Sequence, residues 1–134
     1  MNSTPSLHRT DLAQLIVNRI VQEKDRIKIQ YEVSKNQIGY FFIDDLLPPE
    51  ITEYINSQFP SNDAMVLKKS IRENKYIGVQ MNQYERILEE LIYAFQDERV
   101  VNLIKDVCGI EDLQPDKNLY AGGLSSMKHA QFLN

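Results

Sequence analysis

The stretch NLYAGGLSSMKHAQFLN, residues 118–134, decides the predicted fold class. Residues 119–127 place a Gly122-Gly123 pair among apolar and small residues, which predicts a strand with a glycine-permitted kink. Residues 129–133 predict a second extended run. Strands carry backbone donors and acceptors that need partners, and no later sequence is present to supply them. We therefore expect the first strands of a sheet that this chain leaves incomplete.

Two amphipathic helices are predicted upstream of this stretch. Apolar residues within 84–95 recur at helical spacing, and Glu85, Glu89 and Glu90 are expected on the opposite face. Residues 98–108 carry a second apolar stripe that Gly109 ends, because glycine favours the position just after a helix. Residues 113–118 are then rich in turn-forming residues and lead the chain into the final strands.

Residues 40–63 predict a strand followed at once by a helix. Tyr40-Phe41-Phe42-Ile43 is a short aromatic, β-favouring run that ends at Asp44-Asp45. Pro48-Pro49-Glu50 suits a helix start, because the missing proline N–H would have no helical partner there and Glu50 complements the helix dipole. The helix ends at Phe59-Pro60, and its buried face is expected to comprise Ile51, Tyr54, Ile55 and Phe59.

Residues 64–81 predict extended segments joined by a turn at Glu73-Asn74. They contain a basic cluster of Lys68, Lys69, Arg72 and Lys75. This cluster could contact an anion or a polar substrate. We favour a solvated sheet edge, because lysines commonly protect the edges of sheets from unwanted pairing.

The N-terminal segment predicts a long helix with one apolar face. Thr10 or Asp11 is the expected cap, and apolar residues recur at helical spacing from Leu12 to Ile27. The following IKIQYEV segment, residues 27–33, alternates apolar and polar residues. It suits either a continuing helix or a strand, and both alternatives remain open.

Composition limits the classes of function. The chain has 134 residues, 43% of them hydrophobic and 25% charged, values typical of a globular domain. A net charge of -4 argues against a general nucleic-acid surface, because lysine and arginine drive phosphate binding. Cys108 is the single cysteine, and no signal segment or membrane-length apolar run is present. We expect a soluble cytoplasmic protein with Cys108 buried, and neither nucleic acid nor membrane as a partner.

Few residues are candidates for catalysis. The sequence lacks a phosphate loop, paired metal-binding cysteines, a closely spaced histidine pair and a serine nucleophile elbow. His8 and His129 lie far apart, and His129 is interpreted as structural. Asp44-Asp45 could be a carboxylate pair, but adjacent strand residues point to opposite faces. We interpret that pair as turn and capping residues, and we predict no catalytic, cofactor-binding or metal-binding residue in this chain.

Several segments together resemble the iron(II)- and 2-oxoglutarate-dependent oxygenases related to prolyl 4-hydroxylases. They are residues 42–50, the helix ending at Phe59-Pro60, the helix pair closing at residues 108–110, and residues 113–124 with their Gly-Gly pair. The resemblance covers residues 38–134. It implies an α+β fold in which N-terminal helices pack on the first strands of an incomplete double-stranded β-helix, or jelly-roll, sheet. Residues 1–37 are the expected tail and amphipathic helix, and residues 38–134 the expected truncated oxygenase-like domain.

In that family, the strand after the Gly-Gly segment ends in a His-x-Asp or His-x-Glu metal motif, and a second histidine follows much later. This chain ends at Asn134, just before the expected motif, and has no matching 2-oxoglutarate clamp. Ser126-Met127 stands near the place where relatives often have a cosubstrate-contacting tyrosine, and Ala130-Gln131 where glycines are frequent. The resemblance thus implies iron(II), 2-oxoglutarate and an unknown substrate for a full-length parent, and an inactive 134-residue chain.

Two alternatives remain beside this reading. The chain could be a complete, non-enzymatic α+β interaction module that binds a partner, or a second copy, through the strand edge near residues 125–133. It could also be a shortened paralogue that has lost catalysis and keeps a scaffolding role.

Overall fold

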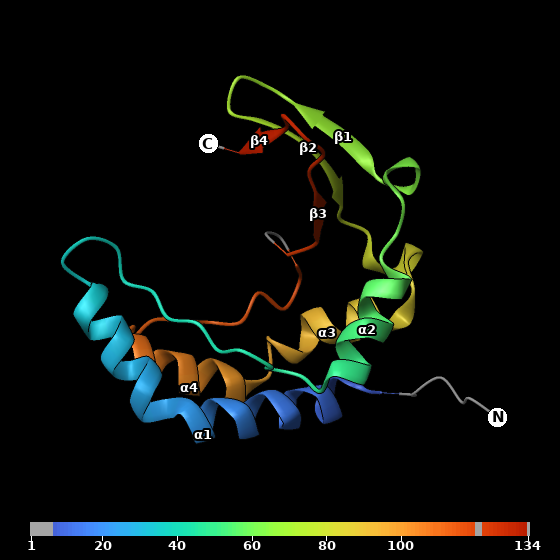
Figure 1. Cartoon of the computed structure of the whole chain (residues 1–134). Coiled ribbons are helices and arrows are strands. Elements are labelled where there is room, and N and C mark those ends of the chain that lie inside the picture. Colours follow the sequence, from blue (N-terminus) through green and yellow to red (C-terminus); the bar gives the residue numbers. More distant parts are fainter. Residues whose placement is uncertain (1–6, 120–121, 134) are drawn as a thin grey trace.

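The computed structural model describes residues 7–119 and 122–133, which form four α-helices and an open antiparallel sheet (Figure 1). In chain order the helices are α1 (Arg9–Ser34), α2 (Pro49–Gln58), α3 (Arg86–Ala94) and α4 (Glu98–Cys108). The strands are β1 (Val66–Lys69), β2 (Glu73–Gly78), β3 (Leu124–Ser126) and β4 (Phe132–Leu133), and the short 3-10 turns are η1 (Asn62–Ala64) and η2 (Met81–Gln83). The predicted mixture of helices and strands is confirmed.

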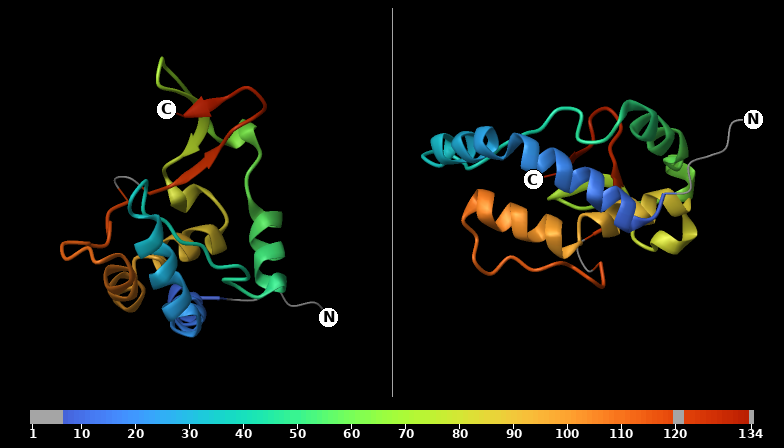
Figure 2. Two further views of the ribbon diagram at one scale, coloured as in Figure 1. Left: turned by 60° about the vertical axis from the view of Figure 1, so that its left-hand side comes forward. Right: turned by 90° about the horizontal axis from the view of Figure 1, so that it is seen from below.

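The core lies within the helical layer. α1 packs along α4 and α3, and α2 packs on α3, so that α1 and α4 lie side by side when viewed from below (Figure 2). Apolar side chains at helical spacing build this core because each helix buries one stripe against its neighbours. The largest fully buried ones are Leu12, Ile16, Ile27, Val100 and Val107.

α1 continues through Ser34, which decides between the two alternatives for residues 27–33. A strand would place Ile27, Ile29 and Val33 on one face. In the helix Ile27 is fully buried against the core, whereas Ile29 and Val33 are 65% and 73% exposed. The N-cap is His8 instead of the predicted Thr10 or Asp11. Asp11 still serves the helix start, because its carboxylate accepts a hydrogen bond from the His8 N–H at 3.4 Å.

The predicted strand at Tyr40–Ile43 is wrong. This segment is not part of a sheet and runs along α1, whose side chains bond its backbone. The Phe42 N–H donates to Gln30 Oε1 at 3.0 Å, and Arg26 Nη2 donates to the Phe42 carbonyl at 2.7 Å. Ser34 Oγ accepts from the Tyr40 N–H and donates to the Tyr40 carbonyl. These polar side chains take the place of a partner strand.

The predicted helix starts and stops are largely confirmed. α2 begins at Pro49, but Phe59 is its C-cap and is 39% exposed, not part of a buried face. Gly109 ends α4 in the left-handed conformation, with φ 65°. Glu90, expected on the solvent face of α3, is buried.

The sheet has the order β1-β2-β3, and β4 pairs with β2 on the same side as β3. β1 and β2 form a hairpin in which Leu67 lies opposite Tyr76 and Lys68 opposite Lys75. The hairpin turn lies at residues 70–72 and not at the predicted Glu73-Asn74, which belong to β2. Ser70 fixes this turn, because its Oγ accepts from the N–H groups of Arg72 and Glu73, both at 3.2 Å.

The sheet extends beyond the helical layer (Figure 1). The chain returns from β2 to this layer through η2, which contacts α3. The expected packing of helices directly on the strands is replaced by packing of the helices chiefly on one another. Leu124 of β3 and Met81 of η2 reach the core and join the two layers. Within the described residues, no helix combines the length and the apolar character needed to cross a membrane.

Candidate functional site

Asp44 and Asp45 form a turn, as interpreted from the sequence. Asp45 adopts a left-handed conformation with φ 54°. The Arg19 guanidinium donates to the carbonyl of Asp44 at 2.7 Å and to that of Asp45 at 3.1 Å. The turn is therefore fixed to α1 through its backbone, which agrees with a structural role for this acidic pair.

The two histidines remain far from each other in the fold. His8 caps α1 and lies with Nδ1 3.4 Å from Arg86 Nη2, whereas His129 is exposed in the turn that precedes β4. Over residues 7–119 and 122–133, no three histidine, cysteine or acidic side chains come together in a way that could hold a metal ion.

Cys108 lies near the end of α4 and is half-buried, less than the sequence suggested. Burial raises the pKa of its thiol. Because the thiolate is the nucleophilic form of cysteine, this environment favours an unreactive thiol at neutral pH.

An ion pair between the partly exposed Arg9 and the buried Glu90 joins the start of α1 to α3. The Glu90 carboxylate accepts hydrogen bonds from the Arg9 N–H at 2.5 Å, from Nη2 at 2.8 Å and from Nε at 3.2 Å. The Arg9 guanidinium also stacks 4.3 Å from the centre of the Tyr93 ring. Its side-chain hydrogen bonds hold the pKa of Glu90 below the usual range of a glutamate, despite burial. Glu90 therefore stays ionised, which suits a structural ion pair and not a general acid.

Spacing along α3 could have revealed the burial of Glu90. It lies three residues after Ile87 and four before Ala94, and both of those are buried. Its partner Arg9 is 81 residues away in the sequence, so the pair itself was not predictable from local pattern.

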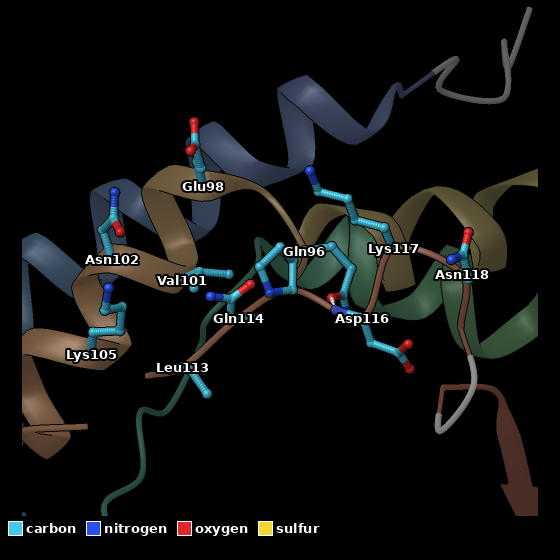
Figure 3. A pocket seen from close by; sticks show the side chains of 11 residues that line it. Gln96, Glu98, Val101, Asn102, Lys105, Leu113, Gln114, Asp116, Lys117 and Asn118 are labelled. Atoms are coloured by element: carbon cyan, nitrogen blue, oxygen red, sulfur yellow. Dashed lines mark hydrogen bonds between the residues drawn. The ribbon is translucent and has the colours of Figure 1, made fainter. Parts of the chain in front are cut away.

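A hollow of about 700 Å³ lies between α4 and residues 113–118 (Figure 3). α4 contributes Glu98, Asn102 and Lys105 to one wall, and Lys117 lies on the other. Gln96 Oε1 accepts a hydrogen bond from the Asp116 N–H, which holds the loop against the helix region. The hollow is lined by uncharged amides, positively charged amines and negatively charged carboxylates. This mixture suits hydrogen bonding to a polar molecule that carries no single dominant charge.

The sheet presents a second candidate surface. We call its exposed apolar side chains the uncovered sheet residues, and they are Val66, Leu67, Ile71, Val79, Met127, Phe132 and Leu133. In the described part of the chain, the strand pairings leave the outer sides of β1, β3 and β4 without a neighbouring strand. Exposed apolar groups beside unpaired strand edges are typical of surfaces that contact another protein segment.

Comparisons of this chain with models of protein families, with characterised proteins and with solved structures found no match.

Proposed function

We propose that residues 38–134 are the support region of an iron(II)- and 2-oxoglutarate-dependent oxygenase of the prolyl 4-hydroxylase type. The observation that supports this most is the open antiparallel sheet, whose β3 and β4 follow the Gly-Gly segment and whose apolar residues are uncovered. A double-stranded β-helix contains two sheets that face each other, so a first sheet alone would expose such residues. On this proposal the four strands begin the jelly roll.

The proposed role of this chain is mechanical. The buried stripes of α1, α3 and α4 form one packed layer, and Leu124 and Met81 connect the sheet to it. Such support would position the strands that carry iron ligands to within the tolerance that catalysis requires. The ligands and the 2-oxoglutarate clamp would come from sequence outside this chain, and the chain alone would hydroxylate no substrate.

The coding sequence downstream of Asn134 tests this proposal directly. We expect a His-x-Asp or His-x-Glu motif shortly after Asn134 and a further histidine much later. A stop codon, or downstream sequence without these residues, would contradict the parent enzyme.

A thermal melt of the purified chain tests whether the site lies elsewhere. We expect the same melting temperature with and without iron(II) plus 2-oxoglutarate under anaerobic conditions. A ligand at 100 times its dissociation constant stabilises the native state by about 2.7 kcal/mol, so binding would be readily measured. Iron(II) with glutarate, which lacks the keto group, serves as the matched control. A rise specific to 2-oxoglutarate would show that this chain already contains a cosubstrate site.

The exposed edge formed by β3 and β4 favours a second candidate function. Both strands pair only with β2 among the described residues, and Met127 and Leu133 are exposed beside them. A non-enzymatic interaction module could use this edge to pair with a strand of a partner or of a second copy. A monomer with dispersed amide NMR signals and a two-state melt favours such a module, whereas binding of an apolar dye and aggregation favour an uncovered sheet.

A further inference from the structure

The register of the hairpin determines which backbone groups of β1 point outward. The Ser70 N–H donates to the Glu73 carbonyl at 2.7 Å, so the backbone N–H of Ser70 is directed toward β2, at the position of a hydrogen-bonded pair. Hydrogen-bonded and non-hydrogen-bonded pairs alternate along an antiparallel ladder. Lys68 and Val66 therefore direct their backbone groups to β2, and Leu67 and Lys69 direct theirs away from it. The outer edge of β1 thus offers two residues for strand pairing.

This edge is positively charged on an acidic protein. Residues 66–78 contain four basic side chains and one acidic side chain, while the whole chain has a net charge of -4. Glu73 forms ion pairs with Lys68 at 2.9 Å and with Lys75 at 3.4 Å. No ion pair joins Lys69 or Arg72 to a carboxylate in the part of the chain that the structure describes. The positive charge next to the outward backbone groups is therefore only partly neutralised.

Apolar side chains accompany this charge. Leu67 is 48% exposed and lies on the same face of the sheet as Lys69, because side chains alternate along a strand. Ile71, at the tip of the hairpin, is 93% exposed. On the face that carries Leu67 and Lys69, an added strand would therefore meet first an apolar and then a basic side chain, two residues apart.

We propose that the outer edge of β1 binds an extended segment of another protein as an added strand, in which apolar and acidic side chains alternate along each face of the strand, opposite Leu67 and Lys69 on one face. The edge of a second copy is disfavoured as the occupant, because pairing two such edges would bring lysines close to lysines. The charge of Lys69 and Arg72 selects an acidic partner, and the backbone groups of Leu67 and Lys69 hold it in register. This inference does not depend on the oxygenase proposal, since β1 lies at the sheet edge opposite β3 and β4.

A synthetic peptide with the repeat Val-Val-Glu-Glu, which alternates valine and glutamate along each face of an extended strand, tests the proposal by fluorescence anisotropy. We expect saturable binding that weakens with added salt, and roughly tenfold weaker binding to the double variant Lys69→Glu/Arg72→Glu, about 1.4 kcal/mol. Lys28→Glu/Lys35→Glu makes the same change of net charge at exposed positions in and directly after α1 and should leave affinity within about twofold, as expected for surface residues outside the contact. Equal weakening by Lys28→Glu/Lys35→Glu would mean non-specific attraction and would overturn the proposal.

The peptide itself provides a test that cannot disturb folding of the protein. Methylating its backbone nitrogens at alternate residues removes the donors on one side of the strand. We expect one of the two alternately methylated peptides to lose binding and the other to retain it. Amide NMR signals of Leu67 and Lys69 should shift on binding of the unmodified peptide. No binding, equal binding of both methylated peptides, or shifts confined to β3 and β4 would each overturn the proposal.

Discussion

At the scale of single residues, replacing the Glu90 carboxylate should lower the stability of the fold even when the shape of the side chain is kept. Glu90→Gln keeps the volume but removes the charge that Arg9 bonds through three nitrogens. Arg9 is partly exposed, so water compensates some of the loss. We expect a loss of about 2 kcal/mol in the free energy of unfolding at neutral pH. Urea denaturation measures it, and Glu53→Gln on exposed α2 surface should change it by less than about 0.5 kcal/mol.

The same pair predicts a pH dependence with a definite sign. Hydrogen bonds from Arg9 lower the pKa of Glu90 in the folded protein, so the folded state favours the ionised form. The resulting stabilisation is complete above the unfolded pKa of a glutamate, about 4.3, and is lost as the pH falls through the lower folded pKa. The difference between wild type and Glu90→Gln should be constant from pH 7 to about 5 and should shrink below about 4.3. A difference that stays constant down to acid unfolding would contradict this assignment.

Residue-scale features were predictable where they depend on neighbours in the sequence. Gly109 ends α4 as expected, because the need for a left-handed residue is local to the helix end. The cap of α1 was displaced to His8 because several polar residues near a helix start can satisfy the same N–H groups. The spacing of Ile87 and Ala94 could have indicated that Glu90 is buried, but local pattern carries no information about a partner 81 residues away, Arg9.

At the scale of elements, Gly123 controls how closely β3 approaches β2. A Cβ at Gly123 would lie 2.7 Å from the Gly78 carbonyl oxygen, a backbone atom that cannot move without disturbing β2. At Gly109 a Cβ would meet nothing within 4 Å, and only its positive φ opposes substitution. We expect Gly123→Ala to cost about 2 kcal/mol or more and Gly109→Ala about 1 kcal/mol. Thermal melts compare them, and an equal or smaller loss for Gly123→Ala would refute close packing of the two strands.

The segment at Tyr40–Ile43 shows why β-favouring residues did not make a strand. Aromatic residues favour an extended backbone, and the segment is extended, but its hydrogen bonds go to Arg26, Gln30 and Ser34 of α1. A strand needs a neighbouring strand, which local propensity cannot identify. Two extended segments joined by a turn were predicted for the β1–β2 hairpin, and they are present. The turn lies at residues 70–72, where Ser70 Oγ accepts hydrogen bonds from two N–H groups, and not at the predicted Glu73-Asn74.

This interpretation predicts the effect of removing Gln30. In Gln30→Ala the Phe42 N–H loses its acceptor. Its amide should then exchange with solvent roughly tenfold faster, which corresponds to a loss of about 1.4 kcal/mol in the free energy of local opening. Global stability should fall by about 1 kcal/mol or less, because Phe42 lies near the surface. Hydrogen exchange followed by NMR measures both. Asp25→Ala, on the exposed side of α1, is the control, and unchanged exchange at Phe42 in Gln30→Ala would show that water already replaces the bond.

At the scale of the whole molecule, the helical layer was more predictable from sequence than the sheet. In residues 12–27, 84–95 and 98–108, the helical spacing of apolar residues indicates which side chains of each segment are buried. These segments contribute most of the core. The relation of sheet to helices depends on contacts between distant segments, such as Leu124 with the core. The basic cluster at the β1 edge was identified from the sequence, but the hollow beside α4 was not, because its walls come from segments that local pattern does not bring together.

The uneven distribution of buried side chains predicts that the two layers differ in local stability. Ile16 and Ile20 of α1 are buried in the core, whereas every residue of β1 is exposed. Local opening requires less free energy where little apolar surface is buried. The amides of Val66 and Lys68, which face β2, should therefore exchange at least about a hundredfold faster than those of Ile16 and Ile20, close to 2.7 kcal/mol. Native-state hydrogen exchange measures the difference, and equal protection would show that sheet and helices open as one cooperative unit.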